Sequence, residues 1–328
     1  MPYKLVTIGS TGHIGVLFVY GGECRIMEEL YFVMSGSDRN SYVYCPWCNK
    51  AWSGWDVNLY KDHPNHNGTS VNFSGIFIQL DFLSCAEEDR LMKGIDEMSW
   101  APSQSGRRKQ NFGPKCNFKK KRLKLGDFNG FPAFTKFVQE KFRDVEILHD
   151  YQTIEQCSLE YNPTRGASID PHIDDCWVWG ERIITVNLLS DCVLTLTPYQ
   201  GDSGRYNLQD IKTYPAVLNQ DGKVISKNGT ACVNNHISLE NSPHDSDIVV
   251  RVPMPRRSLL VMYGSARYVW EHCVLRQDVT ERRVCLAYRE FTPPYLEGGT
   301  HESEGNVILD IARNFWSHEG NSVIAQEV

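Results

Sequence analysis

The chain carries three residues whose types and spacing suit a metal centre. A His-x-Asp triplet, His172-Ile173-Asp174, is followed much later by His272. Two histidines and one carboxylate are the ligand set of non-haem Fe(II) centres that activate oxygen, because three protein ligands on one face leave the other iron positions open. The triplet alone is weak evidence, since ten histidines and 40 acidic residues would give roughly one such match by chance.

The residues around the triplet predict strands, at 158–162, 182–189 and 192–199. Side chains at positions i and i+2 of an extended segment point to the same side, which suits His172 and Asp174 as ligands of one metal. Rival third ligands are His236, His244 and His301. We prefer His272 because its neighbours are apolar and strand-like, whereas His244 and His301 lie among acidic, turn-rich residues.

Two arginines follow His272 on one short, strand-like run. Alternation with a period of two puts Arg283 and Arg289 on one face, with Cys285 and Ala287 between them. Two permanent positive charges separated by small side chains form a slot for a dianionic 2-oxo acid, because the planar fork of arginine matches a carboxylate. On a solvent-facing strand the same pattern would be an ordinary polar stripe. The metal ligands upstream favour the slot.

Together these residues resemble the AlkB-type Fe(II)/2-oxoglutarate dioxygenases, and within them the AlkB homologue four subfamily. The resemblance covers roughly residues 70–328 and is most specific at 103–110, 170–182 and 281–285. It implies that Fe(II) is held by His172, Asp174 and His272. It also implies that the cosubstrate 2-oxoglutarate is held by Arg283, Arg289 and the hydroxyl of Tyr161. The implied reaction is oxidative removal of an N-methyl group as formaldehyde.

The resemblance leaves two substrate classes open. It implies a methylated protein lysine, with actin as the suggested target, or N6-methyladenine in DNA. Nucleic-acid repair members of the family often carry an acidic residue four positions after the first ligand, where this chain has Cys176. That difference favours a protein substrate. Asp175 could pair with a methylammonium group, and Trp177 could add a cation–π contact or simply pack in the core.

A basic segment precedes these motifs. Residues 103–124 contain nine Lys or Arg and no acid, although the net charge of the whole chain is −6. One interpretation is a substrate-gripping lid, because AlkB relatives place their recognition loops before the barrel; its contacts would come from Arg107, Arg108, Lys109 and Phe112. A second is a nucleic-acid contact, with basic residues on phosphates and aromatic rings on bases. The third is a solvated face with nuclear-import character.

The N-terminal region holds a second group of potential metal ligands. Cys45 and Cys48, with His63 and His66, could bind Zn(II), although two residues between the histidines are fewer than the usual three to five. The alternative is a reduced, structural cysteine pair. Eleven scattered cysteines in a chain of this length indicate reduced thiols inside the cell. We therefore expect a protein of the cytoplasm and nucleus. We also expect a monomer with no membrane segment.

The expected fold is mainly β with flanking helices: a double-stranded β-helix (jelly-roll) core with an N-terminal helical buttress. Apolar periodicity predicts helices at 85–98 and 133–142, and a closing helix from Ile308 to Phe315. Ser84 and Glu87 fit a capping box at the start of the first helix. We expect a Cys/His-containing extension, 1–68, and a dioxygenase domain, 69–328, with the basic lid and an inter-strand insertion, 200–246. The alternative from another class is a partner-binding scaffold with a vestigial iron site.

Overall fold

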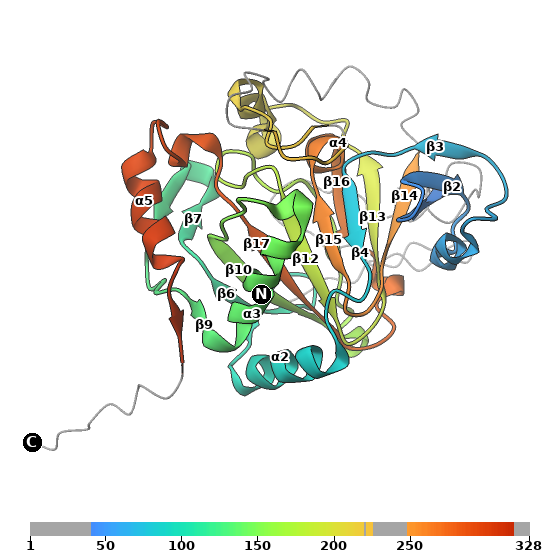
Figure 1. The fold of residues 1–328 in the computed structure, drawn as a ribbon, viewed down its shortest axis with the longest axis horizontal. Helices are drawn as coiled ribbons and strands as arrows, with labels where there is room; N and C mark the ends of the chain where they lie inside the picture. Colours follow the sequence, from blue (N-terminus) through green and yellow to red (C-terminus); the bar gives the residue numbers. More distant parts are fainter. Residues whose placement is uncertain (1–40, 220, 226–247, 318–328) are drawn as a thin grey trace, which may run out of the picture.

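The computed structural model describes residues 41–219, 221–225 and 248–317 of the chain. Its centre is eight strands, β10 (Glu155–Tyr161), β11 (Ile169–His172), β12 (Ile183–Leu188), β13 (Cys192–Pro198), β14 (Val249–Met254), β15 (Leu259–Met262), β16 (Trp270–Val274) and β17 (Arg283–Arg289). Apart from β13 and β14, consecutive strands alternate between two sheets, ordered β11-β16-β13-β14 and β15-β12-β17-β10. This antiparallel order is that of a jelly roll. The predicted mainly β fold is therefore confirmed (Figure 1).

Both sheets grow beyond these eight strands. The first continues past β14 through β1 (Ser41–Cys45), β2 (Lys50–Ser53) and β3 (Ser70–Asn72). The second gains β4 (Ile76–Gln79) at one edge, and β6 (Arg108–Phe112) and β5 (Ala101–Pro102) at the other. Because β1 runs parallel to β14, the described part of the predicted extension shares a sheet with the jelly roll. The predicted boundary after residue 68 stays a prediction.

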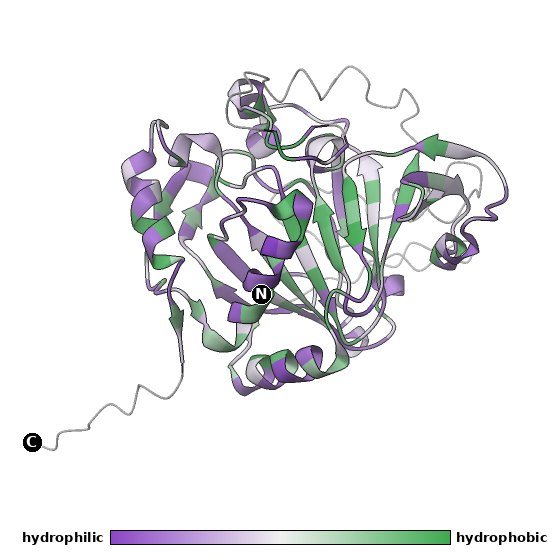
Figure 2. Cartoon of the chain, in the orientation of Figure 1, coloured by the Kyte–Doolittle hydropathy of each residue, from purple (hydrophilic) through white to green (hydrophobic). Residues whose placement is uncertain are grey.

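Two apolar clusters cover the two faces of the second sheet. Between the sheets, Cys285 of β17 packs with Leu196 and Val250 of the facing strands. On the outer face, Val284 and Leu286 of the same strand join the helices. The predicted alternation along 283–289 is therefore confirmed, and Figure 2 shows the apolar strands at the centre of the molecule. Burying each such side chain contributes about 1.5–3 kcal/mol.

The outer cluster is completed by two helical segments. α2 (Cys85–Glu97) begins at the predicted capping box, in which Ser84 and Glu87 satisfy each other's backbone N–H groups. The helix predicted at 133–142 is divided into a 3-10 turn, α3 (Lys136–Lys141) and a second 3-10 turn. From these segments Leu91, Ile95, Val138 and Phe142 enter the cluster beside the second sheet.

The end of the described chain differs from the sequence expectation. The closing helix is α5 (Glu302–Ile311), and Phe315 lies instead in β18 (Phe315–Trp316), which pairs with β9 (Phe131–Pro132). The helical prediction for Phe315 was wrong because its spacing from Ile308 mimicked one helical face, while its backbone pairs with a distant strand. The α5 helix and β2 lie at opposite sides of Figure 1.

The remaining elements are short, and they include β7 (Lys115–Asn117), β8 (Arg122–Lys124), α4 (Gly264–Tyr268), and the 3-10 turns η1 (Val57–Asp62), η2 (Phe118–Lys120) and η7 (Arg205–Thr213). The predicted insertion, 200–246, is described as far as 219 and at 221–225, and the rest lies outside the described residues. None of the helices in the described ranges has the length and apolar character needed to cross a bilayer.

Candidate active site

Three potential iron ligands meet at the edge of the first sheet. His172 is the last residue of β11 and pairs directly with His272 of β16, so their ring centroids lie 4.2 Å apart. Asp174 follows two residues later, past the end of β11. The prediction of one extended segment for both ligands was therefore only half right: the strand ends at His172, and a loop carries the carboxylate.

The loop that carries Asp174 is fixed by a buried cation. Arg267 of α4 is fully buried and donates to the carbonyl oxygens of Asp174 (2.7 Å), Trp179 (3.1 Å) and Gly180 (3.3 Å). Three such bonds from one rigid fork hold the backbone on both sides of the turn. Sequence reasoning missed Arg267, because no local motif marks a residue that acts on a loop 93 positions away.

The hydrogen bonds in this cluster leave ligand atoms without partners. Nδ1 of His172 lies 2.8 Å from the carbonyl oxygen of Asp170, so its proton sits on Nδ1 and Nε2 keeps a lone pair. Oδ2 of Asp174 and Nδ1 of His272 are buried and have no hydrogen-bond partner. Buried polar atoms are almost always paired, so these orphans fit a site completed by a cation.

The charges of the cluster also suit a metal. Burial raises the pKa of Asp174, but Arg289, His272 and His172 outweigh it and hold that pKa well below its usual range. Burial, followed by the neighbouring His172, lowers the pKa of His272 well below its usual value. A carboxylate and a neutral imidazole are the protonation states that bind metal.

The two predicted arginines have different surroundings. Arg289 donates to Oδ1 of Asp174 (2.9 Å from Nη2) and to Oε2 of Glu155 (2.6 Å from Nη1). Arg283 is only 2% exposed and donates through Nε to Oδ1 of Asn187 (2.6 Å). Its Nη1 is buried without a partner, and no carboxylate of the described residues forms a salt bridge with it. A buried, unneutralised guanidinium is costly, so it marks an anion site.

Tyr161 lines the same anion site. It lies opposite Arg283 in the β10–β17 ladder, and the guanidinium carbon is 4.7 Å from the ring centroid. Burial raises the pKa of Tyr161 to about 12, so the hydroxyl stays protonated and able to donate to a carboxylate. Asn187, which orients Arg283, was not foreseen, because it lies on another strand and its amide gives no motif.

The residues proposed for substrate contact are partly engaged with the protein. Asp175 accepts from Nδ2 of Asn207 (2.7 Å) and from the backbone N–H of Trp177 (3.3 Å), and burial raises its pKa. Trp177 and Trp179 are 5% and 3% exposed. Phe118, an aromatic residue of the basic segment, lies against both indoles, with centroids 6.3 and 6.5 Å away, and is 48% exposed.

The basic segment divides into two parts. In β6, Arg108 forms an ion pair with buried Glu160 (2.6 Å), Phe112 meets Trp316 edge-on (6.1 Å), and Lys109 is exposed. Arg107 is buried, with its guanidinium 5.9 Å from the Tyr161 ring. A substrate role for these four residues stays a prediction.

The second part of the basic segment is the β7–β8 hairpin, residues 115–124. It is largely exposed and brings Phe118 to the two indoles. The exposed basic side chains at its tip are Lys119, Lys120, Lys121 and Arg122. An aromatic residue within a basic run was the one available sign that this hairpin faces the site.

Comparison with known proteins agrees with this geometry. The mouse alpha-ketoglutarate-dependent dioxygenase alkB homolog 4 is 34% identical over 274 residues, 84% of each chain. The human protein of that name is 35% identical over 84% of this chain and 83% of its own. This chain belongs to the AlkB family of alpha-ketoglutarate-dependent dioxygenases. The family implies Fe(II) and 2-oxoglutarate, and the unpartnered ligand atoms and the unneutralised Arg283 fit both groups.

Other comparisons of the AlkB-family chain are more distant. A Caenorhabditis elegans protein named DNA N6-methyl adenine demethylase is 34% identical over 73% of this chain and 68% of its own. Among solved structures, OsALKBH1 covers 67% of this chain at 9% identity and a TM-score of 0.38. A 2OG-Fe(II) oxygenase-family oxidoreductase from Burkholderia pseudomallei covers 69% of this chain and 87% of its own, at 9% identity and a TM-score of 0.40. No family model matches the chain.

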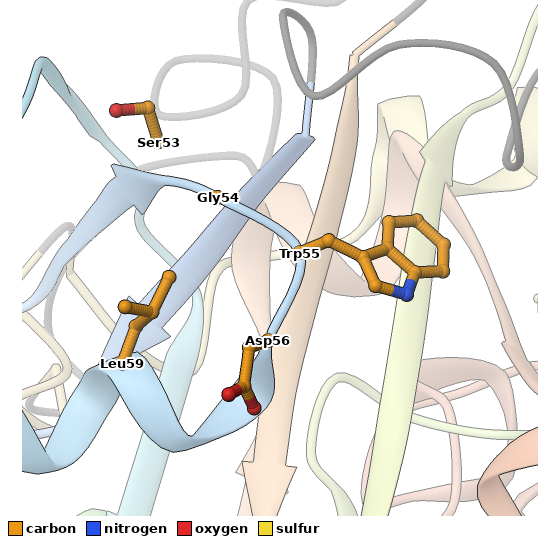
Figure 3. Close-up of a pocket in the computed structure, with 5 residues that line it drawn as sticks. All are labelled: Ser53, Gly54, Trp55, Asp56 and Leu59. Atoms are coloured by element: carbon orange, nitrogen blue, oxygen red, sulfur yellow. The ribbon is translucent and has the colours of Figure 1, made fainter.

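A surface depression lies away from the active site of this AlkB-family enzyme. It is lined by Ser53, Gly54, Trp55, Asp56 and Leu59 (Figure 3). These residues lie at and after the end of β2, whereas the potential iron ligands lie on β11, the loop after it and β16, at the other end of the same sheet. The depression offers one carboxylate and no cation, so its lining lacks the groups that oxygen activation with 2-oxoglutarate requires.

Proposed function

We propose that this enzyme removes an N-methyl group from a protein lysine, using Fe(II), oxygen and 2-oxoglutarate. The observation that carries the proposal is the buried, unneutralised Arg283, which shares one face of β17 with Arg289. Arg289 in turn donates to Asp174, in the cluster of two histidines and one aspartate with unpartnered atoms. The reaction balances as oxygen, 2-oxoglutarate and the N-methyl amine giving succinate, CO2, formaldehyde and the amine with one methyl group fewer.

In this proposal His172, Asp174 and His272 hold Fe(II), which supplies oxygen activation coupled to decarboxylation of the 2-oxo acid. Arg283 binds the distal carboxylate of 2-oxoglutarate through its free Nη1, and the Tyr161 hydroxyl donates a second hydrogen bond. Asn187 keeps the guanidinium in place. Arg289 orients Asp174 and keeps it ionised, and in the proposal a remaining N–H of its guanidinium meets the other carboxylate.

The aromatic group above the site supports a methylated lysine. Phe118, Trp177 and Trp179 converge from the β7–β8 hairpin and from the loop after Asp174, and Phe118 keeps an exposed face. Aromatic faces attract a methylammonium ion. Asp175 adds a carboxylate nearby. Cys176 is fully buried, so the position where nucleic-acid repair members often carry a carboxylate offers no group to a base.

One observation favours a second substrate, N6-methyladenine in DNA. The Caenorhabditis elegans relative carries that activity in its name. The exposed basic tip of the β7–β8 hairpin would suit phosphates, and Phe118 would suit stacking on a base. The two substrates share all of the iron and 2-oxoglutarate chemistry, so the choice between them depends on this hairpin.

We also propose that α2 and α3 serve as the helical buttress of the jelly roll, since their apolar faces share one cluster with the second sheet. The protein partner is a methylated substrate, with actin as the target that the subfamily resemblance suggests. A scaffold with a vestigial iron site would have no use for an unneutralised buried arginine, so we favour catalysis.

The test of the proposal is formaldehyde release by the Fe(II)-loaded full chain with 2-oxoglutarate and oxygen. Three reactions are compared: a methyl-lysine peptide, DNA containing N6-methyladenine, and no substrate, each with His172→Ala as the inactive control. We expect the peptide to stimulate formaldehyde and succinate in equal amounts. Stimulation by the DNA alone would replace the lysine proposal with the adenine one, and no formaldehyde with either substrate would contradict N-demethylation of both.

A further inference from the structure

The segment between β1 and β3 folds with almost no core of its own. Among residues 46–72 only Ala51 and Tyr60 are buried, yet the segment forms β2, η1 and β3. Burial of two side chains does not offset the conformational entropy of ordering 27 residues. Small units with this shortage are usually held by disulfides or by a metal. Cys45 and Cys48 are both free thiols, which leaves a metal.

Four ligand atoms converge inside this segment. One atom each of Cys45, Cys48, His63 and His66 lies within 4.8 Å of the other three. Sγ of Cys45 and Nδ1 of His63 are 3.7 Å apart. In a tetrahedral zinc site, bonds of ~2.3 Å to sulfur and ~2.0 Å to nitrogen separate these two atoms by about 3.5 Å. The cluster therefore has nearly the dimensions of a zinc site.

Local turns bring the two ligand pairs together. Cys45 ends β1 and Cys48 lies in the following turn, which is closed by the Asn49 N–H donating to the Cys45 carbonyl oxygen (3.0 Å). A second turn follows η1, where the Asn65 N–H donates to the Asp62 carbonyl oxygen (2.7 Å), and it presents His63 and His66. Because of this second turn, His63 and His66 converge although fewer residues than usual separate them.

Neighbouring aromatic side chains contact three of the four ligands. The Trp52 ring stacks on His66 at 4.7 Å, and its indole N–H donates to Sγ of Cys48 (3.3 Å). The Trp47 ring stacks on His63 at 5.4 Å. Outer partners of this kind fix ring orientation and stabilise a thiolate. Nε2 of His66 is buried without a hydrogen-bond partner.

We propose that Cys45, Cys48, His63 and His66 bind one Zn(II) in a closed, structural site that fastens the N-terminal segment to the jelly roll. Two thiolates and two neutral imidazoles neutralise Zn(II), and the two thiol protons leave to solvent. Four protein ligands leave no position for substrate, so this metal is not catalytic.

The zinc site would act on the jelly roll through two contacts. Its first ligand, Cys45, ends β1, and β1 pairs in parallel with β14, at Ser41 with Val249. The guanidinium of Arg251 on β14 lies 4.1 Å from the centroid of the Trp55 ring, which points toward the sheet in Figure 3. Loss of the metal would therefore loosen the outer edge of the first sheet, while β11 and β16 at its other end keep their pairing.

The experiment is a Co(II) titration of the reduced full chain carrying Asp174→Ala. This change prevents His172, Asp174 and His272 from competing for Co(II). We expect one equivalent of Co(II) to produce thiolate-to-cobalt charge-transfer and intense tetrahedral d–d absorption, and Zn(II) to displace it. Adding Cys48→Ser should abolish the charge-transfer absorption, whereas adding Cys85→Ser, an exposed cysteine in α2, should leave it unchanged.

A second measurement does not depend on the fold of a variant. In the otherwise unaltered chain, stoichiometric Zn(II) should protect Cys45 and Cys48 from alkylation and leave Cys85 reactive. The zinc site is refuted if Co(II) gives no thiolate absorption in the Asp174→Ala chain, or if Zn(II) leaves the alkylation of Cys45 and Cys48 unchanged. Neither readout requires catalytic turnover, so failure here is distinct from failure of the proposed demethylation.

Discussion

Two clusters of metal-binding side chains lie at opposite ends of one sheet and differ in design. The cluster on β11 and β16 has three ligands, and an unneutralised cation, Arg283, lies on the same face of β17 as Arg289, which contacts Asp174. The Cys/His cluster after β1 has four ligands, all within residues 45–66, and aromatic rings packed on both imidazoles. Three ligands leave coordination positions of a metal open for a cosubstrate, whereas four ligands complete a tetrahedral site.

The difference shows that the two sets of metal ligands in this fold are held by different kinds of contact. The ligands on β11 and β16 are held by long-range contacts, such as Arg267 on the Asp174 loop, because geometry at a reacting centre must survive local motion. The Cys/His ligands are held by two local turns, and the metal itself would supply the missing core. We therefore expect changes at one cluster to leave the other intact.

The largest expected effect comes from removing the aspartate ligand. Asp174→Ala should lower succinate formation to background, a larger loss than the roughly 10–100-fold that follows removal of a supporting partner. Zinc content should not change. Metal analysis and succinate assay of the same preparation check both statements. Iron bound at wild-type stoichiometry in Asp174→Ala would contradict the assignment of three ligands to the first cluster, because Asp174 would then not be a ligand.

The next effect is on stability. Cys48→Ser should abolish zinc binding and, if the site contributes a few kcal/mol, lower Tm by roughly 5–10 °C. Succinate formation well below that Tm should stay within about twofold of the unaltered chain, since the pairing of His172 with His272 lies at the far end of the sheet. Thermal unfolding with and without chelator is the measurement, and Cys85→Ser is the matched control. An equal fall in Tm for both variants would argue against a metal.

Arg283→Lys tests the anion site beside the iron ligands. Lysine keeps the charge but loses the planar fork and the bond to Asn187, so KM for 2-oxoglutarate should rise roughly 10–100-fold, about 1.4–2.8 kcal/mol. The kcat at saturating 2-oxoglutarate should change much less. Asn187→Ala should shift KM in the same direction by a smaller factor. An unchanged KM in Arg283→Lys would place the carboxylate elsewhere.

The smallest effect is expected at a carboxyl group that serves neither cluster. Burial raises the pKa of Glu181 to about 7 from an ordinary value of 4.5. The folded state then favours the protonated acid, so this group's stabilisation is complete below pH 4.5 and is lost as pH rises through about 7. Glu181→Gln should remove that dependence and be more stable than the unaltered chain at pH 8 by about 1–3 kcal/mol.

Urea unfolding of Glu181→Gln and the unaltered chain between pH 5 and pH 8 measures this difference. Gln can still accept the hydrogen bond that the Val217 N–H donates to Glu181. Both chains should bind iron and zinc alike. Parallel pH profiles for the two chains would show that Glu181 is not protonated at neutral pH.

Local sequence patterns predicted much of the fold and of the candidate site. The period-two run of β17 separated Arg283 and Cys285 from Val284 and Leu286 because a strand alternates between two buried faces. The capping box at Ser84 located the start of α2 because both of its bonds are local. In each case the physical cause lies within a few residues of its effect.

Sequence patterns did not predict pairings between residues far apart in the chain. Parallel pairing of β1 with β14 joins residues about 200 positions apart, and no periodicity encodes it. The ion pair of Arg108 with Glu160 on the neighbouring strand was likewise not foreseen. Asn187 was missed for the same reason, since its partner, Arg283, lies on another strand.

The central claim is that β11 and β16 carry an open iron site that turns over 2-oxoglutarate, separate from the closed Cys/His site. Its most direct test is succinate formation by Fe(II)-loaded protein on admission of oxygen, in the unaltered chain, Asp174→Ala and Cys48→Ser. We predict succinate from the unaltered chain and from Cys48→Ser, and none from Asp174→Ala. Succinate from Asp174→Ala at the rate of the unaltered chain, or its loss in folded Cys48→Ser, would contradict this division of roles.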